Sequence, residues 1–142
     1  MILVDTNVFL ELLMDQEKAD DCEKLLSAVS EGKIEAVVSR FTLHAIESVV
    51  KDPEALSTLL RNIENSAGLY IYDTNTSDEF VVSLLMKALK RDFDDSLQYY
   101  VSKKVGAKAI VSFDRHLDQL DIPRAEPDRA LSLFGGGKVR GR

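Results

Sequence analysis

The chain opens with Met1-Ile-Leu-Val-Asp5, a short apolar run of β-prone residues that ends at an acid. The same pattern returns late in the chain, where Ala109-Ile-Val-Ser-Phe113 runs into Asp114. Short runs rich in Val and Ile, without alternation of polar residues, are typical of strands in a sheet that is covered on both faces. The two stretches therefore predict buried strands that end in carboxylates.

Between these stretches, strand-like and helix-like segments alternate. Two more strands are predicted, at residues 34–39 and 69–72. Helices are predicted at residues 8–14, 19–30, 42–50, 53–65, 77–90 and 94–105. After the last strand only a short turn is expected, from Asp114 to Ile122. This order predicts the α/β class, as a three-layer α/β/α sandwich around a short, mostly parallel central sheet.

Length and composition fit one globular domain. The chain has 142 residues, of which 45% are hydrophobic and 30% charged. The single cysteine, Cys22, excludes an internal disulfide and a multi-cysteine zinc site. No apolar stretch approaches the ~20 residues that span a bilayer, and the N-terminus lacks the basic start of a secretory signal. We expect a cytoplasmic protein with no membrane partner.

The charge is acidic overall but basic at the C-terminus. A net charge of −6 argues against a nonspecific nucleic-acid coat protein, which is normally basic. Carboxylates gathered around metal ions would also give an acidic total. Residues 135–142 carry three basic side chains and no acid. We expect a single domain at residues 1–134 and a flexible, basic, glycine-rich tail at 135–142, which is either a plain chain end or an arm for phosphate groups.

Carboxylates recur where the predicted sheet ends. Asp5 follows the first strand, Glu47 lies in the helix after the second, and Asp114 closes the fourth. Three more acids occur at residues 92–95, where the helix before the fourth strand begins. In open α/β sheets, ligands bind at the carboxyl ends of the strands, and we expect at least four of these acids there.

Such a cluster needs neutralisation. Two unit charges 4 Å apart repel by about 4 kcal/mol at an effective dielectric constant of 20, so protons or cations must compensate. Oxygen ligands without Cys or His suit Mg²⁺ or Mn²⁺. Ions held in this way are used for phosphodiester cleavage.

Each acid also has a purely structural interpretation. Asp5 could cap the helix that follows it, and Glu47 could be a solvated surface residue. Asp92 has the position of an N-cap, with Asp95 three residues later as the reciprocal acid. Asp114 could open a short helical turn. The recurrence of acids at strand ends, rather than any one of them, favours a site.

Four motifs contain these acids, namely Val4-Asp5-Thr6-Asn7, Ser39 through Glu47, Asp92-Phe-Asp-Asp-Ser-Leu97 and Val111-Ser-Phe-Asp114. In this order they resemble the PIN-domain family of metal-dependent ribonucleases. Many small prokaryotic members of the family are the toxin halves of toxin–antitoxin modules and are called VapC-like. The resemblance covers residue 1 to about residue 134.

The resemblance implies a site and an activity. The metal-binding and catalytic acids would be Asp5, Glu47, Asp95 and Asp114, with supporting roles for Asn7, Asp92 and Ser112. Asp92 is also the rival of Asp95 for the third position. The implied activity is hydrolysis of single-stranded RNA by water activated on Mg²⁺ or Mn²⁺. The implied partners are the RNA substrate, a second copy of the chain and an antitoxin protein.

A homodimer is also expected from the helices on either side of Pro53. They carry more apolar residues than one small domain should cover, namely Val49, Val50, Leu56, Leu59 and Leu60.

Other classes fit less well. An aspartate-nucleophile phosphatase needs a second Asp two positions after the first, and Asn7 stands there. A response-regulator receiver needs an acid pair after the first strand, which is missing. The main alternative is a catalytically weak PIN-like module that binds RNA or a protein.

Overall fold

The computed structural model describes residues 1–135, and within that range the chain forms one five-stranded sheet with seven α-helices. The strands are β1 (Ile2–Val4), β2 (Ala36–Ser39), β3 (Leu69–Tyr72), β4 (Ile110–Val111) and β5 (Arg124–Ala125). They lie in the order β3-β2-β1-β4-β5, and every neighbouring pair is parallel. The predicted parallel α/β fold is confirmed.

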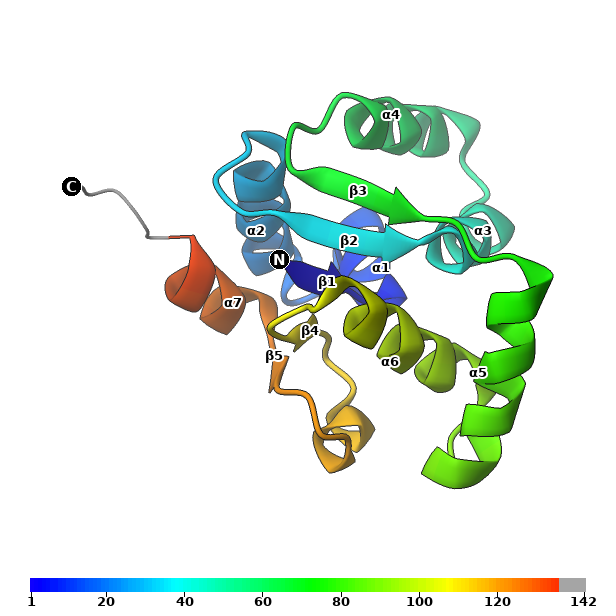
Figure 1. The fold of residues 1–142 in the computed structure, drawn as a ribbon. Coiled ribbons are helices and arrows are strands. Elements are labelled where there is room, and N and C mark those ends of the chain that lie inside the picture. Colours follow the sequence, from blue (N-terminus) through cyan, green and yellow to red (C-terminus); the bar gives the residue numbers. More distant parts are fainter. Residues whose placement is uncertain (136–142) are drawn as a thin grey trace.

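Helices cover both faces of this sheet (Figure 1). They are α1 (Thr6–Leu13), α2 (Ala19–Ser30), α3 (Arg40–Val49), α4 (Pro53–Glu64), α5 (Thr76–Leu89), α6 (Phe93–Val105) and α7 (Pro127–Phe134), with a short 3₁₀ helix, η1 (Arg115–Gln119). The first four helices and α7 share one hydrophobic cluster with the sheet, and α5, α6 and η1 share the other. These two clusters make the three layers.

The central strand β1, with only three residues, contributes side chains to both hydrophobic clusters. Ile2 and Val4 pack into the first cluster, whereas Leu3 packs into the second. All three are at most 1% exposed. Successive side chains of a strand point to opposite faces, so a fully apolar run is what a strand covered on both sides requires.

The C-terminal part contains more structure than the sequence pattern predicted. Beyond Ile122, where only a turn was expected, the chain adds β5 and α7. A two-residue strand is too short to show any hydrophobic period. Helix α7 begins at Pro127 and buries Ala130 against the first cluster. The predicted tail, apart from Gly135, lies outside the described residues.

Two strands lead straight into helices through a capping side chain. Asp5 accepts from the backbone N–H of Thr6 at the start of α1, and Ser39 accepts from that of Thr42 in α3. The carboxyl ends of the strands and the amino ends of these helices therefore meet at one edge of the sheet. No helix within residues 1–135 is long and apolar enough to cross a membrane.

Candidate active site

Asp5 is the buried centre of the strand-end edge. Asp5 is only 6% exposed, and both of its carboxylate oxygens accept hydrogen bonds. Oδ1 accepts from Thr6 N–H at 2.8 Å, and Oδ2 accepts from the Ser112 hydroxyl at 2.7 Å. Burial raises the pKa of Asp5 to about 6; the Ser112 hydrogen bond opposes this, and the charges of Asp94 and Asp95 add to it. The ionised form of Asp5 is therefore destabilised unless a positive charge lies nearby.

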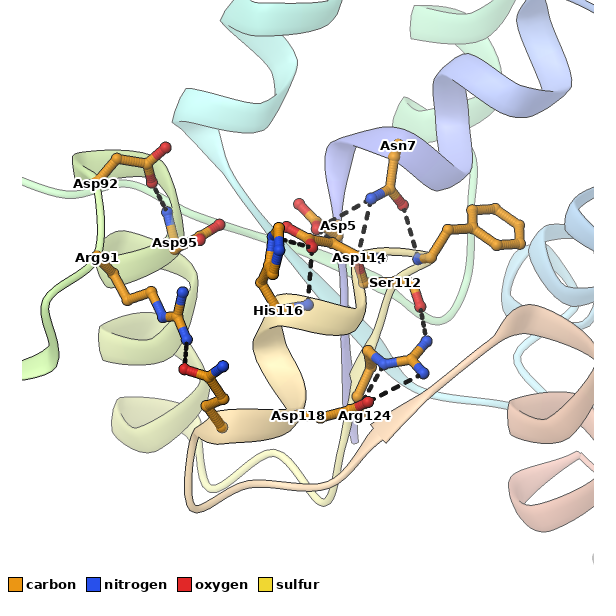
Figure 2. A network of polar contacts seen from close by, with 12 residues as sticks. Asp5, Asn7, Arg91, Asp92, Asp95, Ser112, Asp114, His116, Asp118 and Arg124 are labelled. Atoms are coloured by element: carbon orange, nitrogen blue, oxygen red, sulfur yellow. Dashed lines mark hydrogen bonds and ion pairs between the residues drawn. The ribbon is translucent and has the colours of Figure 1, made fainter.

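Ser112 joins the ends of β1 and β4 (Figure 2). Besides donating to Asp5, its Oγ accepts from Asn7 Nδ2 and from the Asp114 backbone N–H, each at 3.0 Å. Asn7 Oδ1 accepts from the Phe113 N–H at 3.3 Å. The structure thus brings Asn7 and Ser112, both predicted to support the site, into direct contact with the Asp5 region.

Asp92 caps helix α6, as its sequence position predicted. Its Oδ1 accepts from the Asp95 backbone N–H at 2.9 Å. The Asp95 carboxylate points away from Asp92 and toward the region of Asp5 and Asp114 in Figure 2. The pKa of Asp95 is raised to about 6, first by burial and then by the charges of Asp92, Asp114 and Asp94, with Arg91 opposing. Asp95 rather than Asp92 therefore has a free carboxylate at this edge.

Asp114 is the N-cap of the 3₁₀ helix η1 and lies three residues beyond the end of β4. Its Oδ1 accepts from the His116 backbone N–H at 2.9 Å and lies 3.3 Å from Nδ1 of the same residue. The Asp114 carboxylate contributes to the raised pKa of both Asp94 and Asp95. Arg124 fixes the backbone at the end of β4. It donates to the Ser112 carbonyl oxygen at 2.9 Å, and its guanidinium pairs with Asp118 at 2.8 Å.

Asp94 and Gln98 belong to the same edge; Asp94 is one of the three acids noted at residues 92–95, whereas Gln98 was assigned no role. Gln98 Nε2 donates to Asp94 Oδ1 at 2.9 Å. The pKa of Asp94 is raised by burial, against the Gln98 hydrogen bond, and further by the charges of Asp92 and Asp114. The available signal was the Asp–Gln spacing of four residues, which places both side chains on one helix face.

Glu47 lies apart from the other predicted acids. It is in the second half of α3, and its Oε1 is 2.9 Å from Nδ1 of His44 on the same helix. Within residues 1–135, no hydrogen bond or ion pair joins its side chain to the residues around Asp5, and His44 is its partner. Eight residues beyond Ser39, it stands about 12 Å along the helix axis from the end of β2. The structure therefore brings together three of the four predicted acids, and Asp94 with them.

The chemistry of this edge fits a hard divalent cation. Its donors are carboxylate oxygens, and the mutual repulsion of Asp5, Asp94, Asp95 and Asp114 is what a cation would relieve. In the part of the chain that the structure describes, no three His, Cys, Asp or Glu side chains are already arranged to hold a metal ion. The acids are therefore close enough to repel one another, but they are not yet placed as ligands around a single ion.

Comparison with known proteins agrees with the fold. A family model of the PIN domain matches residues 1–116. One similar solved structure is VapC20 of Mycobacterium tuberculosis, described as a toxin that cleaves the sarcin-ricin loop; the TM-score is 0.68 at 16% identity, covering 89% of this chain and 100% of that one. Another is FitAcB of Neisseria gonorrhoeae, with a TM-score of 0.59 at 16% identity, covering 89% of this chain and 98% of that one. No curated protein matches the chain.

Proposed function

The chain belongs to the PIN domain family, and we propose that it is a metal-dependent endoribonuclease that hydrolyses phosphodiester bonds of single-stranded RNA. The observation that carries this proposal is the group of carboxylates around the buried Asp5. Burial, and after it the charges of neighbouring acids, raises the pKa of both Asp5 and Asp95 to about 6. Perturbed acids gathered at strand ends are typical of functional sites rather than of structural ones.

The proposed metal-binding acids are Asp5, Glu47, Asp95 and Asp114, and the ion is Mg²⁺ or Mn²⁺. A bound ion of this kind lowers the pKa of water and stabilises charge on the leaving oxygen. The hydroxyl of Ser112 lowers the pKa of Asp5 and so favours the ionised form that a cation needs. Asn7 holds Ser112 in place. Glu47 would join the others by leaving His44, with which it now pairs.

The test is RNA cleavage by the purified full chain with Mn²⁺ or Mg²⁺, and with a chelator. We expect cleavage that the chelator stops and that Asp5→Asn removes. Asp52→Asn is the matched control, because Asp52 caps α4 through the Glu54 N–H and Asn caps equally well. Full activity of a folded Asp5→Asn variant would refute the assignment.

A second candidate function is an RNA-binding or protein-interaction module with little catalysis. It is favoured by the finding that, within residues 1–135, no three potential ligands are set to hold a metal. Calorimetric titration with Mn²⁺, carried out beside RNA digestion, separates the two functions. RNA binding without cleavage, at saturating Mn²⁺, would favour the module.

We further propose that the chain acts as the toxin of a toxin–antitoxin pair in the cytoplasm. Support comes from the likeness to VapC20, which is described as a toxin. The proposal predicts that expression of the wild-type chain arrests growth of a bacterial host, whereas Asp5→Asn does not. Co-expression of the short reading frame next to its gene should restore growth.

The proposed homodimer has a different surface from the one expected. Most of the apolar residues around Pro53 are covered within one chain; Leu59 is buried, and Val50 and Leu56 pack against the first core cluster. Exposed apolar side chains instead gather on α5, namely Phe80, Val81 and Leu84. Glu79 and Lys87 lie toward opposite ends of this helix, so two antiparallel copies would bring opposite charges together.

The family match ends at residue 116, but the proposed domain extends to residue 134. Ala125 in β5 and Ala130 in α7 belong to the first core cluster. Removal of these elements would uncover that core.

A further inference from the structure

Gln98 is a buried amide behind the carboxylates. The residue is 1% exposed, and its Nε2 lies 2.9 Å from Asp94 Oδ1 and 3.1 Å from Thr42 Oγ1. An ionised carboxylate only accepts hydrogen bonds, so the amide nitrogen must face Asp94. This orientation leaves Gln98 Oε1 buried without a partner among residues 1–135.

The Thr42 hydroxyl connects this amide to the strand ends. Its Oγ1 is 3.1 Å from Thr6 Oγ1 and 3.2 Å from Ser39 Oγ. Thr6 directly follows Asp5, and Ser39 is the last residue of β2. Through Gln98 and Thr42, polar side chains therefore connect α6 to the start of α1 and to the end of β2.

Asp94 is held by one oxygen only. In the described part of the chain, Gln98 is its only hydrogen-bonding side-chain partner, through Oδ1. Through Gln98 and Thr42 it is connected to Thr6, the residue next to Asp5. Its second oxygen accepts no hydrogen bond from residues 1–135 and is thus available at the strand-end edge.

We propose that Gln98 is a positioning residue, which holds Asp94 beside Asp5 and Asp114 and so makes Asp94 a further carboxylate of the metal site. The inference rests on the proposed metal-dependent function. A purely structural role explains Gln98 less well, because an unpaired buried acceptor is destabilising and an apolar side chain of similar volume would avoid it. The amide is the residue type that orients a carboxylate, as partners of metal ligands commonly do.

The test is Mn²⁺ binding by calorimetry with the full chain, together with thermal unfolding. Gln98→Met keeps the volume, removes the donor and removes the unpaired acceptor. We expect its Tm without metal to equal or exceed that of the wild type, while the Kd for Mn²⁺ rises by about 10–100-fold. Gln98→Glu, which places a second acid beside Asp94, should also weaken binding and serves if Gln98→Met does not fold. Ser102→Ala is the control, since among residues 1–135 this buried hydroxyl of α6 bonds only to the Tyr99 carbonyl oxygen.

A double substitution decides whether Gln98 acts through Asp94. Asp94→Asn should weaken Mn²⁺ binding alone, and adding Gln98→Met should weaken it no further. Fully additive effects, or wild-type affinity in Gln98→Met, would overturn the inference while leaving the ribonuclease proposal intact. Tight Mn²⁺ binding without RNA cleavage would overturn the ribonuclease and leave the inference. A wild-type chain that does not bind Mn²⁺ would overturn both.

Discussion

The ends of β1 and β4 differ sharply from the C-terminal half of α3. At the strand ends, Asp5 is buried and both of its oxygens accept hydrogen bonds, one of them from Ser112. On α3, Glu47 is exposed, and the only side chain of the described residues with which it pairs is that of His44. A residue directly after a buried strand has its position fixed by the sheet, whereas one two turns along a helix depends on side-chain rotamers. The comparison suggests that the strand-end acids are preorganised and that Glu47 is not.

The largest expected effect on RNA cleavage distinguishes Asp95 from Asp92, the two acids at the N-terminus of α6. Asp95→Asn should reduce metal-dependent RNA cleavage by about 10³-fold, since losing a metal-binding charge removes several kcal/mol of transition-state stabilisation. Asp92→Asn should change cleavage by less than about two-fold, because Asn retains the cap. Cleavage rates at saturating Mn²⁺ measure both. The reverse result would move the third acid to Asp92.

Glu47→Gln sharpens the contrast between preorganised and mobile acids. We expect a loss of about 10–100-fold in cleavage, smaller than for Asp95→Asn, because Glu47 starts outside the cluster. His44→Ala should not reduce cleavage, since it only frees Glu47 from its present partner. Unchanged activity in Glu47→Gln would remove Glu47 from the site.

The pH dependence of stability probes the strand-end acids without any metal. The pKa of Asp5 is raised from 3.8 to about 6 in the folded chain, so the protonated form is favoured there. Below about pH 4, Asp5 is protonated in both the folded and the unfolded chain and its burial costs no charge. As the pH rises through about 6, Asp5 ionises in the folded chain too, and the free energy of unfolding decreases. Asp5→Asn cannot ionise, so its free energy of unfolding at pH 7 should exceed that of the wild type by up to about 3 kcal/mol. Chemical denaturation of the metal-free chain at pH 4.5 and pH 7 checks it; a variant less stable than the wild type at pH 7 would contradict it.

The smallest effect on cleavage is expected for the exposed apolar surface of α5, which carries none of the proposed metal-binding acids. Light scattering at tens of micromolar should give a dimer mass for the wild type and a monomer mass for Leu84→Lys. Leu133→Lys, on the exposed face of α7, should remain dimeric. A monomeric wild type would count against the proposed dimer.

Much of the fold was predictable because its signals are local. The strands at residues 2–4 and 69–72 and the helix at 19–30 have the predicted bounds. Elements set by tertiary contacts were missed: β5 has two residues, and its place beside β4 is invisible in sequence.

The site was predictable where topology determines position. Asp5 and Asp114 lie where the strand ends must bring them, and Asp92 caps α6 as its position indicates. The spacing of Asp94 and Gln98 was a signal for their contact, but the burial of Gln98 against Thr42 was not predictable, because it depends on the packing of α6 against α3. Nor could the sequence indicate that Glu47 would turn toward His44.

The most direct test of the account is the anomalous diffraction of crystals of the full chain soaked in Mn²⁺. The account predicts an anomalous peak at the carboxyl ends of β1 and β4, with carboxylate oxygens of Asp5, Asp95 and Asp114 around it, and no such peak in Asp5→Asn. Oxygen ligands to Mn²⁺ in the wild type, lost in the variant, would establish the site. Wild-type crystals without a peak at this edge, although they diffract well and contain Mn²⁺ in the soak, would contradict the central claim.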